Sequence, residues 1–169
     1  MKSTWVEVNL GLLEANIQSV KKGLAPGRSI IFVVKDRAYG HGLIPVATRA
    51  TQAGVDWFGV VDLDEALQIR KALKAANILL LGVADATEVE EISRNRIVPV
   101  VVSRDHGELL AAEAKRLDCP LTAHLKIDTG MGRLGVLWEE AVETYKALAL
   151  HDHLDLRGLC THLASVEIK

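Results

Sequence analysis

The sequence predicts an α/β protein in which parallel strands alternate with helices. Short apolar runs rich in β-branched residues recur along the 169-residue chain, and amphipathic segments with helical periodicity separate them. Each strand–helix unit takes roughly 20–25 residues, a length that lets a helix cross over between parallel strands. Two architectures share this repeat, the doubly wound sheet and the (β/α)8 barrel. Because 49% of the residues are apolar, we expect a folded core rather than disorder.

Six apolar runs are the predicted strands. The first follows a Pro26-Gly27 turn and is rich in β-branched residues, which favours a strand over a helix. A complete barrel takes about 250 residues, so about six units would stop roughly two short of closure. The six runs are residues 29–34, 57–61, 78–81, 97–102, 121–127 and 156–162, and a further strand-like stretch covers residues 5–9.

Helical patterns fill the intervals between these strands. Several begin after a residue whose side chain can cap a helix, among them Asp62, Asp85 and Ser103. The predicted helices cover residues 10–24, 45–53, 63–75, 86–95, 105–117 and 139–150.

Composition and charge exclude several classes of partner. The net charge is -2, and acidic and basic residues are interspersed, which argues against nucleic acid. No apolar run approaches the roughly 20 residues of a membrane span, and the first residues lack the apolar core of a secretory signal. Cys119 and Cys160 lie far apart and not in a metal-binding spacing. We therefore expect no metal, and free thiols in a reducing cytoplasm.

Lys35 stands at the end of the first predicted strand. Period-2 alternation places it on one face with Ile31 and Val33. The carboxyl ends of parallel strands form the edge where barrels and open sheets bind ligands. An amine that is partly shielded from water there suits Schiff-base formation. On position alone, however, a solvated lysine is the commoner interpretation.

The residues after Lys35 favour a binding loop. Tyr39 offers a hydroxyl that can donate to a phosphate, and Gly40 and Gly42 permit unusual backbone angles and the close approach of a ligand. His41 lies between the two glycines. The loop leads into a helix, whose N-terminus suits an anion. Together these features are unusual for a plain connection.

The fifth predicted strand has one apolar face and one polar face. Thr122, His124, Lys126 and Asp128 share the polar face. Such a stripe fits the lumen of a barrel, where polar groups that leave water tend to mark functional sites. It also fits an edge strand with one solvated face.

Two basic side chains lie near the ends of the last two strands. Arg133 belongs to the glycine-rich stretch 129–135, and its guanidinium can bind a carboxylate or a phenolate oxygen. His162 lies near the carboxyl end of the sixth strand. Alternation places it on one face with Leu156, Gly158 and Cys160. A structural role is the alternative interpretation for this histidine.

In order and spacing, these motifs resemble the alanine racemase family. The resemblance rests on residues 33–42 (Val-Val-Lys-Asp-Arg-Ala-Tyr-Gly-His-Gly) and residues 124–135 (His-Leu-Lys-Ile-Asp-Thr-Gly-Met-Gly-Arg-Leu-Gly), and residues 5–10 and 158–164 fit as well. The resemblance covers essentially the whole chain. It implies a (β/α)8 barrel, present as an incomplete barrel of about six βα units. It also implies that residues 1–169 are part of an N-terminal domain that binds pyridoxal 5'-phosphate.

The resemblance implies a role for five side chains. Lys35 would hold the cofactor covalently and act as one of two catalytic bases, and Tyr39 would bind the cofactor phosphate. Arg133 would contact the phenolic oxygen of the cofactor near the substrate carboxylate. Lys126 matches a lysine that carbon dioxide carbamylates in many members, and its new carboxylate would orient Arg133. His162 would lie against the cofactor ring.

The implied reaction interconverts L- and D-alanine, with serine as a second candidate substrate. In this family the enzyme is a cytoplasmic homodimer that supplies D-alanine for the cell wall. A C-terminal β domain, which this chain lacks, supplies the second base from the partner subunit, and the last barrel units supply further phosphate ligands. We therefore expect the 169-residue chain alone to be weakly active or inactive.

Two residues depart from the family pattern, and two other functions stay open. Asp36 and Arg37 replace the usual Ala and the following Asn, Asp or Ser. Arg37 could bind phosphate, pair with Asp36 or face solvent. The alternative functions are a non-catalytic barrel that binds pyridoxal phosphate, as in the single-domain homeostasis proteins, and a gene fragment with no function of its own.

Overall fold

The structure is a computed structural model that describes residues 4–165. One sheet of seven strands runs through it, and every strand pair is parallel. The strands are β1 (Ile31–Val33), β2 (Trp57–Val60), β3 (Asn77–Val83), β4 (Ile97–Val101), β5 (Leu121–Asp128), β6 (Val136–Leu137) and β7 (Leu154–Thr161). The helices are α1 (Leu10–Lys22), α2 (Lys35–Tyr39), α3 (Leu43–Gln52), α4 (Leu63–Ala72), α5 (Val89–Arg94), α6 (Arg104–Arg116) and α7 (Ala141–Leu148), with short 3-10 turns η1 (Ala86–Glu88) and η2 (Trp138–Glu140).

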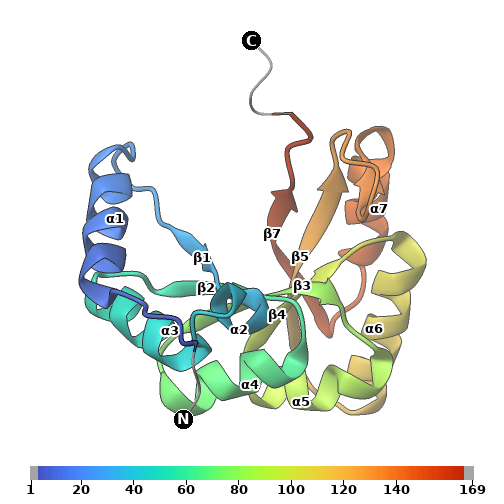
Figure 1. The fold of residues 1–169 in the computed structure, drawn as a ribbon. Helices are drawn as coiled ribbons and strands as arrows, with labels where there is room; N and C mark the ends of the chain where they lie inside the picture. The colour runs from blue at the N-terminus through green and yellow to red at the C-terminus, as the bar shows by residue number, and fades with distance from the viewer. Residues whose placement is uncertain (1–3, 166–169) are drawn as a thin grey trace.

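The order of the strands distinguishes the two architectures that the sequence left open. From β1 to β5 each strand pairs with the one before it, and β5 then pairs with β7 along its length and with the short β6 at its end. A doubly wound sheet would reverse this order at a switch point. The sheet curves and the helices lie along its outer side (Figure 1). The predicted incomplete barrel is therefore confirmed, and within the described residues β1 and β7 each have one strand neighbour.

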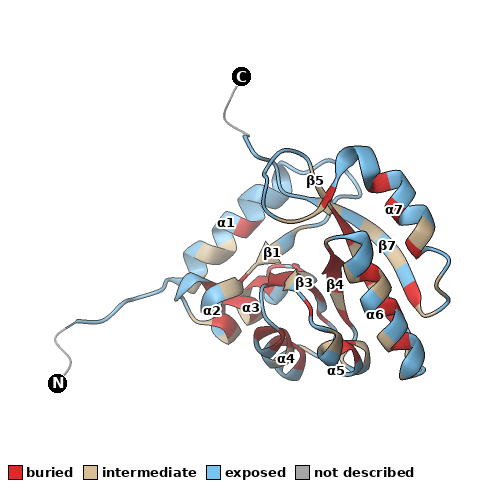
Figure 2. Cartoon of the chain, turned by 90° about the vertical axis from the view of Figure 1, so that its right-hand side faces the viewer, coloured by how far each residue is buried: buried red, intermediate tan, exposed pale blue. Residues whose placement is uncertain are grey.

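The core lies between the sheet and the helices. Phe58, Ile78 and Leu80 point from β2 and β3 toward this layer, and Ile69 and Leu110 meet them from α4 and α6. All five are at most 2% exposed. Figure 2 shows the buried residues concentrated in β3, β4 and the sheet-facing sides of α4 and α6. The other face of each strand is thereby turned toward the hollow of the barrel, as in a (β/α)8 architecture.

The predicted caps are confirmed at all three helix starts. Asp62 Oδ1 accepts the Glu65 N–H at 2.9 Å, Asp85 Oδ1 accepts the Thr87 N–H at 2.8 Å, and Ser103 Oγ accepts the His106 N–H at 3.1 Å. Each bond satisfies an N–H that the helix itself leaves without a partner. The predicted helices 86–95 and 139–150 each open with a 3-10 turn, which leads into α5 and α7 respectively.

The strand predicted at residues 5–9 is wrong. Residues 4–9 form no regular element, and Trp5 and Val6 are 73% and 82% exposed. Asn9 instead caps α1, with its Oδ1 accepting the Leu12 N–H at 3.0 Å. A strand-like composition indicates a strand only where a neighbouring strand offers hydrogen bonds, and this stretch has none beside it in the described chain.

The alternation predicted for the last strand is also wrong, because β7 contains a bulge. Leu156 pairs with Ala123, but His124 pairs with Gly158 rather than with Arg157. The extra residue moves Leu156 to the helix side, whereas Gly158 and Cys160 face the hollow.

Among residues 4–165, no helix has the length and apolar character that crossing a membrane requires.

Candidate active site

The predicted site residues lie at the carboxyl ends of β1, β5 and β7, in two groups. Lys35 and Tyr39 form the first group, with Lys35 Nζ 6.0 Å from the centroid of the Tyr39 ring. Lys126, Arg133 and His162 form the second group and line one small recess together with Asp128 and Met131. Lys126 is only 8% exposed, whereas Arg133 and His162 are open to solvent. All of them stand on the edge where barrels place their ligands.

The segment after Lys35 is a left-handed helical turn rather than an ordinary loop. Asp36, Arg37, Ala38 and Tyr39 have φ values of 52°, 56°, 56° and 54°. This backbone region costs a residue with a side chain roughly 1–2 kcal/mol, so four in succession cost on the order of 4–8 kcal/mol. Strain of this size persists only where the surrounding structure holds it, and it is concentrated at functional sites.

Several contacts hold this turn. The N–H of Ala38 donates to Val34 O at 2.8 Å, and the N–H of Gly42 donates to Arg37 O at 2.9 Å. Ala38 is 5% exposed and packs into the core. A contact from a different element completes the set, because Glu65 Oε1 on α4 accepts the Arg37 N–H at 2.6 Å. The turn thus fixes the path from Lys35 to Tyr39.

The two residues that depart from the family pattern point outward. Asp36 and Arg37 are both exposed. The ion pairs within residues 4–165 do not include a bond between them. Of the three interpretations for Arg37, pairing with Asp36 is therefore wrong, and its exposed guanidinium is accessible both to solvent and to a phosphate.

The polar stripe of β5 faces the hollow of the barrel. β5 has β4 on one side and β7 on the other, so it is not an edge strand. The His124 ring lies 6.0 Å from the Trp57 ring across this hollow, and burial lowers the pKa of His124. A Cβ on Gly158 would lie 2.6 Å from the imidazole, so the glycine makes room for it. Burial therefore favours the neutral form of His124, whose ring packs in the hollow.

Lys126, in the polar stripe of β5, lies next to Cys160 of β7. The two residues are paired in the register of β5 and β7. Burial raises the pKa of the Cys160 thiol, and the charge of Lys126 acts in the opposite direction. Lys126 takes part in none of the ion pairs found within residues 4–165. A buried amine that forms no ion pair suits an anionic ligand or a covalent change that removes its charge.

The loop that carries Arg133 is held by the strand it leaves. Asp128 Oδ1 accepts the N–H groups of Gly130 at 2.9 Å and Gly132 at 3.1 Å. These bonds lower the pKa of Asp128, with Gly132 contributing most. Gly135 has a φ of 129°, and a Cβ there would lie 2.7 Å from the Asp128 nitrogen. The loop therefore folds back onto β5 and keeps Arg133 above Lys126.

Sequence reasoning missed one residue of this site and left another without a role. Glu65 supports the Lys35 turn from 28 positions away, and its place in the first turn of a capped helix gave no signal of burial. Asp128 was assigned to the polar stripe but not to the clamping of the glycine-rich loop. The pattern Asp-Thr-Gly-Met-Gly could have suggested it, because aspartate side chains often accept N–H bonds from the residues just after them.

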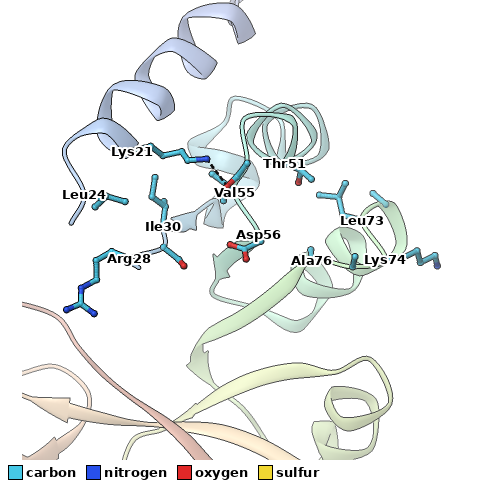
Figure 3. Close-up of a pocket in the computed structure, with 14 residues that line it drawn as sticks. Lys21, Leu24, Arg28, Ile30, Thr51, Val55, Asp56, Leu73, Lys74 and Ala76 are labelled. Atoms are coloured by element: carbon cyan, nitrogen blue, oxygen red, sulfur yellow. Dashed lines mark hydrogen bonds between the residues drawn. The ribbon is translucent and has the colours of Figure 1, made fainter. Parts of the chain in front are cut away.

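A cavity larger than the recess around Lys126 lies at the opposite edge of the sheet, at the amino ends of the strands. It has a volume of about 760 Å³ and is lined by residues that precede β1, β2 and β3, among them Arg28, Asp56 and Ala76 (Figure 3). None of the predicted site residues lines it. In barrels the amino-terminal edge contributes stability, whereas ligands bind at the carboxyl edge.

Fold and site together define a barrel protein with an amine, a phenol and a guanidinium at its carboxyl edge. The family "Alanine racemase, N-terminal domain" matches residues 8–169, and the chain belongs to this family. A curated alanine racemase from Symbiobacterium thermophilum is 36% identical over 99% of this chain and 44% of its own length. The chain thus spans less than half the length of the curated relatives it matches.

Three solved structures share the fold. An alanine racemase from Clostridium difficile 630, in complex with cycloserine, has a TM-score of 0.90 and 32% identity over 98% of this chain and 46% of its own. A histidine racemase from Leuconostoc mesenteroides has a TM-score of 0.85 and 25% identity over 92% and 42%. An alanine racemase from Bartonella henselae, with covalently bound pyridoxal phosphate, has a TM-score of 0.83 and 26% identity over 94% and 46%.

Proposed function

We propose that the chain is the cofactor-bearing part of an amino-acid racemase that depends on pyridoxal 5'-phosphate. Its preferred substrate is alanine, with serine and histidine as candidates to be compared with it. The observation that carries this proposal is the left-handed turn, which joins a lysine at the barrel edge to a tyrosine whose ring lies 6.0 Å from the amine. When bound, the cofactor supplies an electron sink for the charge left at the α-carbon after deprotonation.

The first group of residues fits the phosphate and the covalent attachment of this cofactor. Lys35 is partly buried at the mouth of the barrel, where its Nζ could hold the cofactor covalently. Once the amine of the substrate has displaced it, the freed Nζ could take or return the α-proton on one face of the substrate. Tyr39 is 58% exposed, so its hydroxyl is free to donate to a phosphate. The strained turn between them keeps the two groups at a fixed separation, which lowers the entropic cost of binding.

The second group fits the ring and the substrate carboxylate. Arg133 presents a guanidinium that can bind a phenolic oxygen or a carboxylate. Lys126 lies below it in the recess, and carbamylation would convert a buried amine into a carboxylate that pairs with Arg133. His162 borders the same recess and would contact the cofactor ring.

The complete enzyme would need groups that come from outside this chain. Inversion requires a proton donor on the face of the α-carbon opposite Lys35, and the family resemblance places it on a partner subunit. We therefore propose a cytoplasmic homodimer for the complete enzyme. We expect the 169-residue chain alone to form little or no D-alanine from L-alanine, and ready racemisation by the purified chain would contradict this expectation.

Attachment of the cofactor tests the proposal directly. The chain is incubated with pyridoxal phosphate and reduced with borohydride, and the modified peptides are mapped by mass spectrometry. We expect the adduct on Lys35, and we expect Lys35→Ala to remove it. Lys71→Ala, which changes an exposed lysine on α4, is the matched control and should leave the yield unchanged. Modification spread evenly over surface lysines would refute the proposal.

A further inference from the structure

The proposed function leaves one buried charged group without a role. Glu65 lies in the first turn of α4 and is 5% exposed. Its Oε1 accepts the Arg37 N–H at 2.6 Å, and its Oε2 accepts no hydrogen bond from the described residues. Glu65 therefore faces the left-handed turn with a carboxylate that has one polar contact there.

Stability alone does not explain a carboxylate at this position. A buried carboxylate normally pairs with a lysine or an arginine, because removing a charge from water is unfavourable. The ion pairs within residues 4–165 do not include Glu65. An apolar side chain of similar size could occupy this buried position without this desolvation. The charge of Glu65 instead serves to stabilise the left-handed turn of residues 36–39.

The contact lies where the strained backbone needs an acceptor. Arg37 follows Asp36, the first residue with positive φ, and an N–H this near the start of a helical turn has no partner within the turn. Hydrogen bonds to an ionised acceptor are roughly twice as strong as those between neutral groups. A carboxylate fixed in α4 thus holds the peptide between Asp36 and Arg37 in one orientation, and that orientation sets the direction from Lys35 to Tyr39.

We propose that Glu65 is a positioning residue, which holds the left-handed turn through the Arg37 N–H and thereby places Lys35 and Tyr39 for the cofactor. The effect on the turn stands by itself, whereas the consequence for the cofactor rests on the proposed function. Glu65 does not touch the cofactor in this scheme. It acts through the backbone of residues 36–39.

Two variants of the full chain separate charge, hydrogen bonding and packing. Glu65→Leu keeps an apolar side chain of similar size and removes both oxygens, and Glu65→Gln keeps an oxygen that can accept the Arg37 N–H. Glu143→Leu is the control, because Glu143 lies exposed in the first turn of α7. Amide hydrogen exchange at Arg37 reports the turn, and the yield of the reduced pyridoxal phosphate adduct on Lys35 reports its use.

We expect Glu65→Leu to speed exchange at Arg37 by at least about tenfold, the effect of losing one hydrogen bond to a charged group. Exchange at Leu79 and Val100 in β3 and β4 should stay unchanged, and the Lys35 adduct should fall by a similar factor. Glu65→Gln should restore most of both readouts. Equal protection of Arg37 in Glu65→Leu and in the unmodified chain would overturn the inference.

The remaining outcomes also decide the question. If Glu65→Leu does not fold, the Arg37 amide proton in Glu65→Gln decides, since a neutral acceptor must move its chemical shift upfield, and an unchanged shift would overturn the inference. If the unmodified chain forms no Lys35 adduct but Glu65→Leu still exposes the Arg37 amide, the proposed function fails while the action of Glu65 on the turn is supported.

Discussion

Two segments at the same edge of the barrel present basic side chains by opposite means. After β1, four residues with side chains adopt positive φ, and a carboxylate from α4 helps to hold them. After β5, the positive φ values fall on Gly130, Gly132 and Gly135, and Asp128 of the same strand holds the loop. The first segment stores strain and the second avoids it. Stored strain suits the residue that must keep one geometry, whereas a relaxed loop suffices to present Arg133.

The largest effect is expected from a side chain added to the loop after β5 at a position that has no room for it. A Cβ at Gly135 would lie 2.7 Å from the Asp128 nitrogen, and its φ is 129°. Gly135→Ala combines backbone strain with a contact to rigid backbone, so we expect it to lower the free energy of unfolding by about 3 kcal/mol. Urea titration followed by circular dichroism measures this change, and a loss below about 1 kcal/mol would mean that the loop relaxes freely.

A matched pair of substitutions adds a side chain to the glycine-rich loop and removes one from the strained turn. Gly132 has a φ of 68° with nothing within 4 Å of its Cβ position, so Gly132→Ala should cost about 1 kcal/mol through backbone strain alone. Arg37→Gly should gain roughly the same amount, because glycine adopts its φ of 56° without strain and the Glu65 contact involves only backbone. The same titration measures both, and changes of equal sign would contradict the comparison.

Low pH should weaken the contacts that hold the second loop, because they depend on the Asp128 carboxylate. The N–H groups of Gly132 and Gly130 lower the pKa of Asp128 below its ordinary value. The charged form is therefore favoured in the folded chain, and its contribution is complete above the unfolded pKa of about 4 and is lost as pH falls through the lower folded value. The melting temperature should thus drop more between pH 5 and pH 3 in the unmodified chain than in Asp128→Asn, although the effect is small because Asp128 is solvated. Equal drops would show that the clamp does not depend on charge.

The regular strands and helices of this molecule could largely be predicted from its sequence. The periodicity of residues 97–102 and the caps at Asp62, Asp85 and Ser103 are local signals, and the structure repeats them. Lys35 and Arg133 could also be placed at the barrel edge, because each follows a strand directly. The polar stripe of β5 was recognised, although only its neighbours on both sides showed that it faces the hollow.

The features that escaped prediction are non-local. Arg37 and Ala38 as residue types do not indicate positive φ, and contacts with Val34 and Glu65 hold them in it. The bulge at Arg157 depends on the fit of β7 to β5 and reverses the orientation expected for Leu156. Residues 5–9 have the composition of a strand, but no strand within residues 4–165 pairs with them. In each case the chain is shaped by a partner that lies elsewhere in the sequence.

A crystal structure of the chain after reduction with pyridoxal phosphate would test the central claim most directly. We predict a covalent adduct on Lys35 Nζ, the phosphate within hydrogen-bond distance of the Tyr39 hydroxyl, and positive φ at all four residues from Asp36 to Tyr39. An adduct on another lysine, or a turn that becomes right-handed or extended around the bound cofactor, would contradict the account.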